Sequence, residues 1–298
     1  MAKKENKEYT LESYCIKEKP FYIPSGNEVE IFKIAYNKQL PVMLVGPTGC
    51  GKNRFIDYMA WELGKDVAKV TGKKKAVKKT KHKAKPSEGK PLVKVSCHED
   101  LSADDLLGRY LLDGTYMDGA GLSAFKNGSI LYLEEFVESR KDVQVMVHPL
   151  ADKPRVLTVE KLGSIFEAHP EFMLVLSYNP GYQTIGKEPK PSTRQRFITL
   201  DFEYAKPEDE AKIIRQESGL DLETSMHLVH AANKIRNLKG KDQGLDEGAS
   251  TRLLINAGHL ITDGIPPKDA IQVAIINSLT YNPDTKKGIE DIINVIFP

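Results

Sequence analysis

The residues with the most distinctive chemistry form one run, Gly46-Pro47-Thr48-Gly49-Cys50-Gly51-Lys52, which follows the apolar segment 42–45. Its glycines let the backbone turn tightly, so that consecutive N–H groups point into one concavity that suits an anion. A helix that begins near Lys52 adds its positive N-terminal end, and the lysine ammonium reaches the outer phosphates of a nucleotide. A glycine-rich turn with a structural lysine is the alternative, but the apolar run before it and the amphipathic stretch 54–63 after it favour a nucleotide-binding phosphate loop.

The residue after the lysine departs from the usual pattern of such loops. Ser or Thr normally stands there and binds Mg²⁺ through its hydroxyl, whereas this chain has Asn53. An amide oxygen can also ligate a hard cation, but Mg²⁺ demands near-ideal octahedral geometry. Asn53 is therefore a candidate metal ligand, and the sequence indicates nucleotide binding more strongly than hydrolysis.

Two acids, Glu134 and Glu135, follow the apolar run 129–133. In hydrolytic proteins with a phosphate loop, the first acid holds Mg²⁺ and the second polarises the attacking water. The first acid is normally Asp, and Glu134 is longer by one methylene group. Two hypotheses stay open: Glu134 reaches further towards a metal that Asn53 holds less closely, or the chain is an impaired hydrolase. A solvated strand end is the plainer alternative.

Four further polar side chains are candidates for contact with the terminal phosphate. Asn179 follows another apolar run and could orient the attacking water, although Asn-Pro is also a turn signal. Arg194 and Arg196 precede a third run, and an arginine suits the charge on a transferring phosphoryl group. We favour Arg196 as this arginine finger over surface ion pairing. Arg252 lies at the start of a later helix, from which it could reach over the phosphates.

Short apolar runs predict the scaffold that positions these side chains. The runs at 42–45, 92–96, 129–133, 172–178 and 197–200 alternate with helical segments, one of them expected over 99–107 with an acidic first turn. This alternation predicts a parallel sheet that is covered by helices on both faces. Open α/β sheets bind ligands at the carboxyl ends of their strands, so we expect Lys52, Glu134, Glu135 and Asn179 in one crevice.

The strand signal disappears after about residue 206. The stretches 208–217, 222–237, 249–262, 267–279 and the last ten residues are typical of helices, with glycines and prolines between them. We therefore predict an α/β nucleotide-binding domain over residues 1–204 and a small all-helical lid domain over residues 205–298.

The composition of the 298 residues indicates a cytoplasmic protein. No apolar run approaches the roughly 20 residues that span a bilayer. The first residues carry no apolar core behind their charges, so we expect no secretory signal. Cys15, Cys50 and Cys97 are few and odd in number, which favours a reducing compartment over a disulfide framework or a zinc site.

The net charge of +2 hides an uneven distribution. Eleven lysines lie between positions 65 and 90, where Asp66 and Glu88 are the only acids, so the rest of the chain is acidic. The segment 65–91 is too polar to offset its ordering entropy by burial, and we predict a disordered surface insertion. Such a ribbon could contact a polyanion, but it has no aromatic side chain to stack on bases.

Taken in order along the chain, these motifs resemble an AAA+ ATPase of the MoxR branch, specifically the CbbQ/NirQ/NorQ family. The resemblance covers nearly the whole chain. Beyond the phosphate loop, it includes the segments 20–28, 40–44, 58–61, 96–101, 107–112, 168–172, 177–183, 190–197 and 245–254.

The resemblance implies a role for each candidate residue. Lys52 corresponds to the Walker A lysine, Glu134 and Glu135 to the Walker B acids, Asn179 to sensor 1, Arg196 to a finger acting on the neighbouring subunit, and Arg252 to sensor 2. Tyr110 matches the insert that faces the ring pore in the family. Asn53 and Glu134 replace the family's Thr and Asp, and the lysine-rich insertion lies outside its pattern.

The resemblance also implies a hexameric ring, a partner with a von Willebrand A domain, and a client enzyme. Clients in the family are Rubisco, from which inhibitory sugar phosphates are released, and nitric oxide or nitrite reductases. Our leading hypothesis is a chaperone ring that hydrolyses ATP with Mg²⁺ to remodel such a client. The alternatives are a nucleotide-gated assembly factor with weak or no hydrolysis, suggested by Asn53 and Glu134, and a nucleic-acid-dependent ATPase, suggested by the lysine-rich ribbon.

Overall fold

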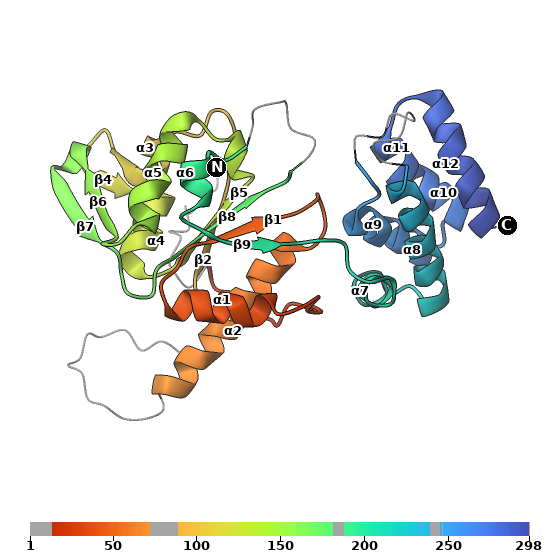
Figure 1. The fold of residues 1–298 in the computed structure, drawn as a ribbon, viewed down its shortest axis with the longest axis horizontal. Helices are drawn as coiled ribbons and strands as arrows, with labels where there is room; N and C mark the ends of the chain where they lie inside the picture. The colour runs from red at the N-terminus through yellow and green to blue at the C-terminus, as the bar shows by residue number, and fades with distance from the viewer. Residues whose placement is uncertain (1–13, 72–88, 181–187, 239–244, 246, 298) are drawn as a thin grey trace, which may run out of the picture.

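A computed structural model describes residues 14–71, 89–180, 188–238, 245 and 247–297. Figure 1 shows a sheet with helices packed around it and, on the other side of one connecting segment after β9, a separate group of helices. The predicted disorder of residues 72–88 and the matched residues 181–183 fall outside the described part of the chain.

Five parallel strands form the central sheet in the order β2-β5-β8-β1-β9. They are β1 (Val42–Val45), β2 (Leu92–Ser96), β5 (Ile130–Glu134), β8 (Met173–Tyr178) and β9 (Ile198–Asp201). Val42 of β1 is paired with Val175 on one side and with Ile198 on the other, which makes β1 an interior strand. The predicted parallel sheet is confirmed, with strand ends within one residue of those expected.

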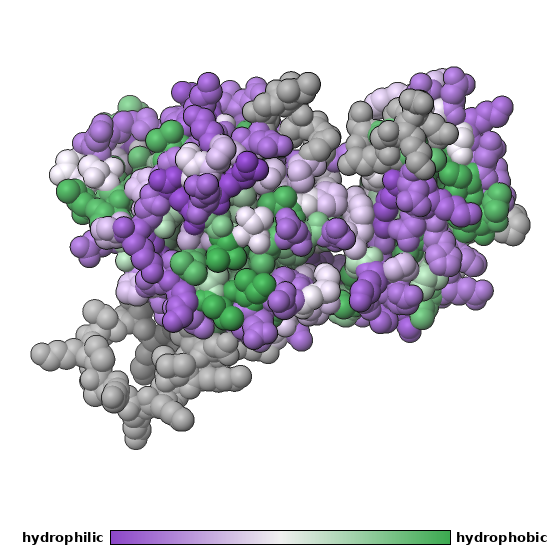
Figure 2. Space-filling model, viewed as in Figure 1, coloured by the Kyte–Doolittle hydropathy of each residue, from purple (hydrophilic) through white to green (hydrophobic). Residues whose placement is uncertain are grey.

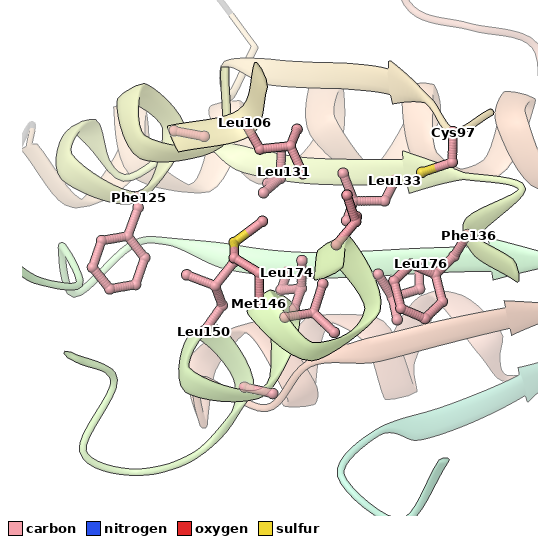
Figure 3. Close-up of a cluster of buried hydrophobic side chains, with 14 of the residues drawn as sticks. Cys97, Leu106, Phe125, Leu131, Leu133, Phe136, Met146, Leu150, Leu174 and Leu176 are labelled. Atoms are coloured by element: carbon pink, nitrogen blue, oxygen red, sulfur yellow. The ribbon is translucent and has the colours of Figure 1, made fainter. Parts of the chain in front are cut away.

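Side chains of one strand alternate between the two faces of the sheet, and both faces are buried. On one face, Leu131, Leu133, Leu174 and Leu176 contribute to the same apolar cluster as Met146 and Leu150 of α5 (Lys141–Ala151). Figure 3 shows the strand leucines pointing towards this helix. Each such leucine stabilises the fold by about 1.5–3 kcal/mol through burial.

The other face of the sheet is covered by α1 (Glu28–Asn37) and α2 (Lys52–Thr71). Phe32 of α1 and Phe55 of α2 meet edge to face, with ring centroids 5.4 Å apart, over Val42 and Leu44. Since α2 begins at Lys52, directly after the phosphate loop, this packing fixes the position of the loop as well as that of the helix.

Smaller elements complete the α/β part. They are α3 (Ala103–Leu107), the hairpin of β3 (Gly108–Tyr110) and β4 (Tyr116–Asp118), α4 (Ala120–Asn127), η2 (Phe136–Glu138), the hairpin of β6 (Val156–Val159) and β7 (Ser164–Glu167) with η3 (Glu160–Leu162) between its strands, and α6 (Pro191–Arg194). The helix expected over 99–107 begins only at Ala103. Ser102 caps it, because its side chain accepts from the Asp105 N–H and the Asp105 carboxylate accepts from the Ser102 N–H at 3.0 Å.

The structure describes both ends of the predicted insertion, residues 65–71 and 89–91. Helix α2 continues to Thr71. At the other end Lys90 is buried, and its ammonium lies 2.5 Å from a carboxylate oxygen of Glu171. Gly64 and Gly89 allow this close packing, because a Cβ atom on Gly64 would lie 2.4 Å from the Gly89 Cα. Disorder of residues 72–88 stays a prediction.

The helices after β9 form what we term the lid. They are α7 (Pro207–Ser218), α8 (Leu222–Arg236), α9 (Thr251–Thr262), α10 (Pro267–Ile271), the π-helical turn η4 (Gln272–Ile276), α11 (Asn277–Leu279) and α12 (Pro283–Ile296). Their apolar side chains form a core of their own, and the expected helical segments are all present. The boundary placed between residues 204 and 205 falls in the connecting segment and stays a prediction. Among the described helices, none combines the length and apolar character that a membrane span requires.

A buried ion pair lies inside the lid. Glu210 is 0% exposed, and its two carboxylate oxygens accept from Arg236 Nη2 at 2.7 Å and Nη1 at 2.8 Å. The Thr251 hydroxyl donates to the same carboxylate at 2.6 Å. The Arg236 guanidinium also lies 3.7 Å from the centre of the Tyr204 ring, so the pair ties α7 and α8 to the segment that leads into the lid.

We predict that Glu210→Ala lowers the free energy of unfolding by about 3–5 kcal/mol, because it leaves the Arg236 guanidinium buried without its counter-charge. Asp209→Ala is the matched control. Asp209 pairs with Lys212 at the lid surface, and its loss will cost at most about 1 kcal/mol. Urea denaturation followed by circular dichroism measures both values, and equal losses in the two variants would contradict the prediction.

Candidate functional site

A cavity of about 500 Å³ lies at the carboxyl ends of the central strands and is closed on one side by the lid. Phosphate-loop residues 48–52 and the adjoining Asn53 line it. Glu134, Glu135 and Asn179 come from the ends of two neighbouring strands, and Arg252 comes from α9 of the lid. The strand ends thus bring the candidate side chains into one crevice.

In the view of Figure 2 the surface over the α/β part and the lid is largely hydrophilic.

Two glycines of the phosphate loop are required by close packing. A Cβ atom on Gly46 would lie 2.3 Å from the Phe202 carbonyl oxygen, just beyond β9. Gly49 has a φ of +68°, and its Cβ would lie 2.7 Å from the Ser250 Cβ in the lid. The loop is therefore held between the sheet on one side and the lid on the other.

The Lys52 ammonium lies inside the loop. Its Nζ donates to the carbonyl oxygens of Gly46 at 2.7 Å and Pro47 at 2.8 Å. Only 8% of Lys52 is exposed, and this burial lowers the pKa of its ammonium. Two neutral carbonyls hold the side chain, and the charges of Glu134 and Glu135 favour its cationic form against the effect of burial. The loop therefore holds a cation suited to an anionic ligand.

Glu135 has a strained backbone and a perturbed carboxyl group. Its φ of +54° lies in the left-handed region, which costs a residue other than glycine about 1–3 kcal/mol. Burial, with added repulsion from Glu134, raises the pKa of the Glu135 carboxyl. A carboxyl group with a raised pKa, held beside a phosphate loop, is suited to accept a proton from water.

Both the nitrogen and the oxygen of the Asn53 side-chain amide form hydrogen bonds. Its Nδ2 donates to Glu134 Oε1, and its Oδ1 accepts from the Tyr132 hydroxyl at 2.7 Å. Tyr132 is also hydrogen-bonded to Ser177 Oγ, at 2.8 Å. The amide oxygen that we expected to ligate a metal therefore has a partner in the sheet, and the metal-ligand role of Asn53 stays a prediction. Sequence reasoning missed Tyr132 and Ser177, which lie within apolar runs and carry no motif.

Asn179 and the loop residue Thr48 connect the sheet to the lid. Asn179 is 5% exposed, and its Nδ2 donates to Thr48 Oγ1 at 3.4 Å. The Thr48 hydroxyl in turn donates to Glu247 Oε1 at 3.0 Å, while the Tyr204 hydroxyl donates to the Thr48 carbonyl at 3.3 Å. Glu247 was not among the candidates, and the sequence contains no signal for it beyond its position five residues before Arg252.

The two arginines before β9 lie away from the cavity lining. Arg196 Nε is 2.9 Å from both carboxylate oxygens of Asp152, and its Nη1 donates to the Ser192 carbonyl at 2.6 Å. Arg194 faces Glu188 at 3.9 Å. Neither guanidinium lies by the phosphate loop of its own chain, and the finger role of Arg196, which concerns a neighbouring subunit, stays a prediction.

Apolar and aromatic side chains also line the cavity. Phe21, Tyr22, Ile23, Phe202, Ala205 and Ile213 contribute to its lining. Tyr22 stacks on Tyr58 with ring centroids 5.4 Å apart. Arg54 of α2 and Glu217 of α7 form an ion pair at 2.7 Å beside this region. The cavity therefore offers cationic and hydrogen-bonding groups for phosphates and apolar side chains for a planar base.

Comparison with known proteins identifies the family of the chain. The C-terminal model of the CbbQ/NirQ/NorQ family matches residues 210–296, and the model of the AAA domain of the dynein-related subfamily matches residues 69–197. Protein CbbQ of Hydrogenophilus thermoluteolus is 45% identical, over 95% of this chain and 97% of that protein. Protein NorQ of Paracoccus denitrificans is 46% identical, over 93% and 94%. The denitrification regulatory protein NirQ of Pseudomonas aeruginosa is 44% identical, over 93% and 97%.

Solved structures show the fold. The RuvB Holliday junction branch migration motor of Thermotoga maritima matches with a TM-score of 0.51 and 13% identity, over 94% of this chain and 74% of that one. NtrX of Brucella abortus matches with a TM-score of 0.54 and 13% identity, over 93% and 63%. These likenesses concern architecture alone, whereas the identities of 44–46% extend over almost the entire sequence. The chain therefore belongs to the CbbQ/NirQ/NorQ family of AAA+ ATPases.

Proposed function

We propose that the protein is an ATP-hydrolysing, chaperone-like motor that activates or remodels a client enzyme. The observation that carries this proposal is the meeting of the Lys52 ammonium, the Glu134–Glu135 pair and Asn179 in one cavity, with Arg252 added by the lid. Phosphoryl transfer needs a cationic phosphate site, a base or water-positioning group and charge stabilisation at the terminal phosphate. The cavity has a candidate for each task.

In the proposed reaction, the loop N–H groups and Lys52 bind the phosphate chain. Glu135 accepts a proton from the attacking water, which Asn179 orients, and Arg252 contacts the terminal phosphate from the lid. Mg²⁺ supplies neutralisation of the phosphate charge when it is bound. The carboxylate of Glu134 fits such an ion, because hard cations prefer oxygen ligands, and Glu134 would hold it with Asn53 beside it.

We further propose a homo-hexameric ring with a von Willebrand A domain partner in the cytoplasm. Two observations support the ring: Arg196 lies outside the cavity of its own chain, and Tyr110, Leu111 and Leu112 are exposed next to the β3–β4 hairpin, where a pore-facing insert is expected. Among the described residues, Cys15, Cys50 and Cys97 form no disulfide bond with one another, which agrees with a reducing compartment. The client is Rubisco or a nitric oxide or nitrite reductase, and the denitrification role in the name of the NirQ relative supports the reductases.

One observation favours a second candidate function, a nucleotide-gated assembly factor with weak or no hydrolysis. The amide oxygen of Asn53 accepts from Tyr132 and is committed to the sheet, whereas a hydroxyl at this position normally ligates Mg²⁺. The nucleic-acid-dependent alternative has no comparable support, because the centre of the lysine-rich ribbon lies outside the described residues.

The proposed hydrolysis is tested by Glu135→Gln. We predict that this variant still binds ATP but releases phosphate at least about 100-fold more slowly, because the amide cannot accept the proton. Lys52→Ala is the comparison variant and will lose ATP binding itself. Calorimetric titration with ATP and a phosphate-release assay measure the two effects. An unchanged rate in Glu135→Gln would remove the basis of the proposed mechanism.

The raised pKa of Glu135 predicts a specific pH dependence. Glu135 must be ionised to accept a proton, so turnover will fall on acidification at a pH above the ordinary glutamate pKa of 4.5. The charge of Glu138 contributes to this elevation. Glu138→Gln removes that charge, lowers the pKa of Glu135, and will move the acidic limb to lower pH. The measurement is kcat/KM against pH, which reports the ligand-free enzyme, and a limb that stays in place or moves upwards would contradict the assignment.

The finger role of Arg196 predicts complementation between two inactive variants. Arg196→Ala alone will lose about 10³-fold or more in turnover, whereas Arg194→Ala, which removes a weak surface pair, will lose little. Mixing Arg196→Ala with Glu135→Gln will restore part of the activity, because some interfaces then join an intact Glu135 to an intact Arg196. Equal losses from the two arginine variants, or no recovery on mixing, would refute an action between subunits.

A further inference from the structure

Four side chains form a continuous hydrogen-bonded row from the middle of the sheet to the acidic side of the cavity. Ser177 of β8 and Tyr132 of β5 are 2% and 0% exposed, and their hydroxyl oxygens are 2.8 Å apart. Tyr132 donates to Asn53 Oδ1 at 2.7 Å, and Asn53 Nδ2 donates to Glu134 Oε1. Two members of this row, Asn53 and Glu134, stand where phosphate-loop hydrolases usually carry Ser or Thr and Asp.

The row fixes which way the Asn53 amide points. A phenol has one proton, so when the Asn53 amide oxygen faces Tyr132, that proton goes to Asn53 Oδ1 and the Ser177 hydroxyl donates to the Tyr132 oxygen. The opposite orientation of the amide would place its oxygen against the Glu134 carboxylate, two acceptors with no proton between them. Tyr132 can accept as well as donate, so it is the Glu134 carboxylate, which can only accept, that sets the orientation of the amide.

The length of Glu134 agrees with this arrangement. Its backbone position is set by strand pairing, because Glu134 of β5 is opposite Ser96 of β2. The carboxylate must extend from that fixed position to the Asn53 amide, and the extra methylene group of glutamate provides the reach. One carboxylate oxygen then accepts from Asn53, while the other is left for a further ligand.

We propose that Asn53 is a positioning residue for Glu134 and that Tyr132 positions Asn53 in turn. The inference rests on the proposed function, because it concerns the acid that would hold Mg²⁺. In this arrangement Asn53 contributes an N–H to Glu134 rather than an oxygen to the ion. The two departures then form one matched unit, in which an amide and a longer acid replace a hydroxyl and a shorter one.

A double-mutant cycle on Asn53→Thr and Glu134→Asp tests the matched unit. The readout is the Mg²⁺ concentration that gives half of the maximal effect on ATP affinity, measured by calorimetry, which does not depend on turnover. We expect each single variant to raise this concentration about tenfold or more, as loss of an orienting partner does at metal sites. The double variant will return to within about threefold of the natural chain, since it carries the usual hydroxyl and acid together.

If Asn53 is instead a poor ligand of Mg²⁺, the cycle gives the opposite result. In that case Asn53→Thr alone will lower the Mg²⁺ requirement, whatever residue is at position 134, and the two substitutions will act independently. A lower Mg²⁺ requirement in Asn53→Thr overturns the inference, and so do independent effects of the two substitutions. Failure of the proposed function is distinct, because it appears in the natural chain itself, which would then release no phosphate from ATP or would not bind ATP at all, whatever the variants do.

Tyr132→Phe tests the second step, since it removes one hydroxyl and retains the buried ring. We expect it to raise the Mg²⁺ requirement in the natural chain and to leave it unchanged in the Asn53→Thr, Glu134→Asp double variant, which has no amide to orient. Tyr36→Phe removes a hydroxyl from α1 as the matched control and will leave the requirement unchanged in both. A merely structural Tyr132 would lower thermal stability in both backgrounds with no change in the Mg²⁺ requirement, and that result would overturn its positioning role.

Discussion

The constraint on which the site depends is the burial of β1 on both faces and along both edges. Its four residues are at most 9% exposed, and the strand is paired in parallel with β8 and β9. The phosphate loop begins where this strand ends. The other end of the loop leads into α2, which packs on the sheet through Phe55. A loop held so firmly at both ends presents its N–H groups without further loss of conformational entropy when a ligand binds.

Much of the sheet and of the site could be predicted from the sequence for one physical reason. Strands buried on both faces are continuous apolar runs, and such runs are visible without knowledge of their partners. The carboxyl ends of parallel strands meet at one edge, so the residues that follow the runs, among them Glu135 and Asn179, were expected together. The same reasoning could not supply the short hairpins, whose strands of three or four residues have no distinctive pattern, nor the start of α3, which depends on the cap formed by Ser102.

The hydrogen bonds that position the site's side chains could not be predicted from the sequence, for a different reason. Tyr132 and Asn53 are 79 positions apart, and Thr48 and Glu247 are 199 apart. Neither pair has a spacing or residue pattern from which the contact could be predicted, because each contact depends on how separate elements pack. Tyr132 in particular looks like one more apolar residue of a buried strand, and only its packing against α2 shows that its hydroxyl is directed at the residue after Lys52.

The phosphate loop is also where the sheet and the lid meet, so a ligand in the loop can act on both. Thr48 is hydrogen-bonded to Asn179 of the sheet and to Glu247 of the lid, and Gly49 lies against Ser250. An anion bound in the loop attracts Arg252, which lines the same cavity, and repels the Glu247 carboxylate, which is joined to the loop through Thr48. Ligand binding therefore changes the electrostatic forces on the lid at both ends of the segment 247–252. In a ring, where Arg196 would contact the next subunit, that change has a direct route to the neighbouring interface.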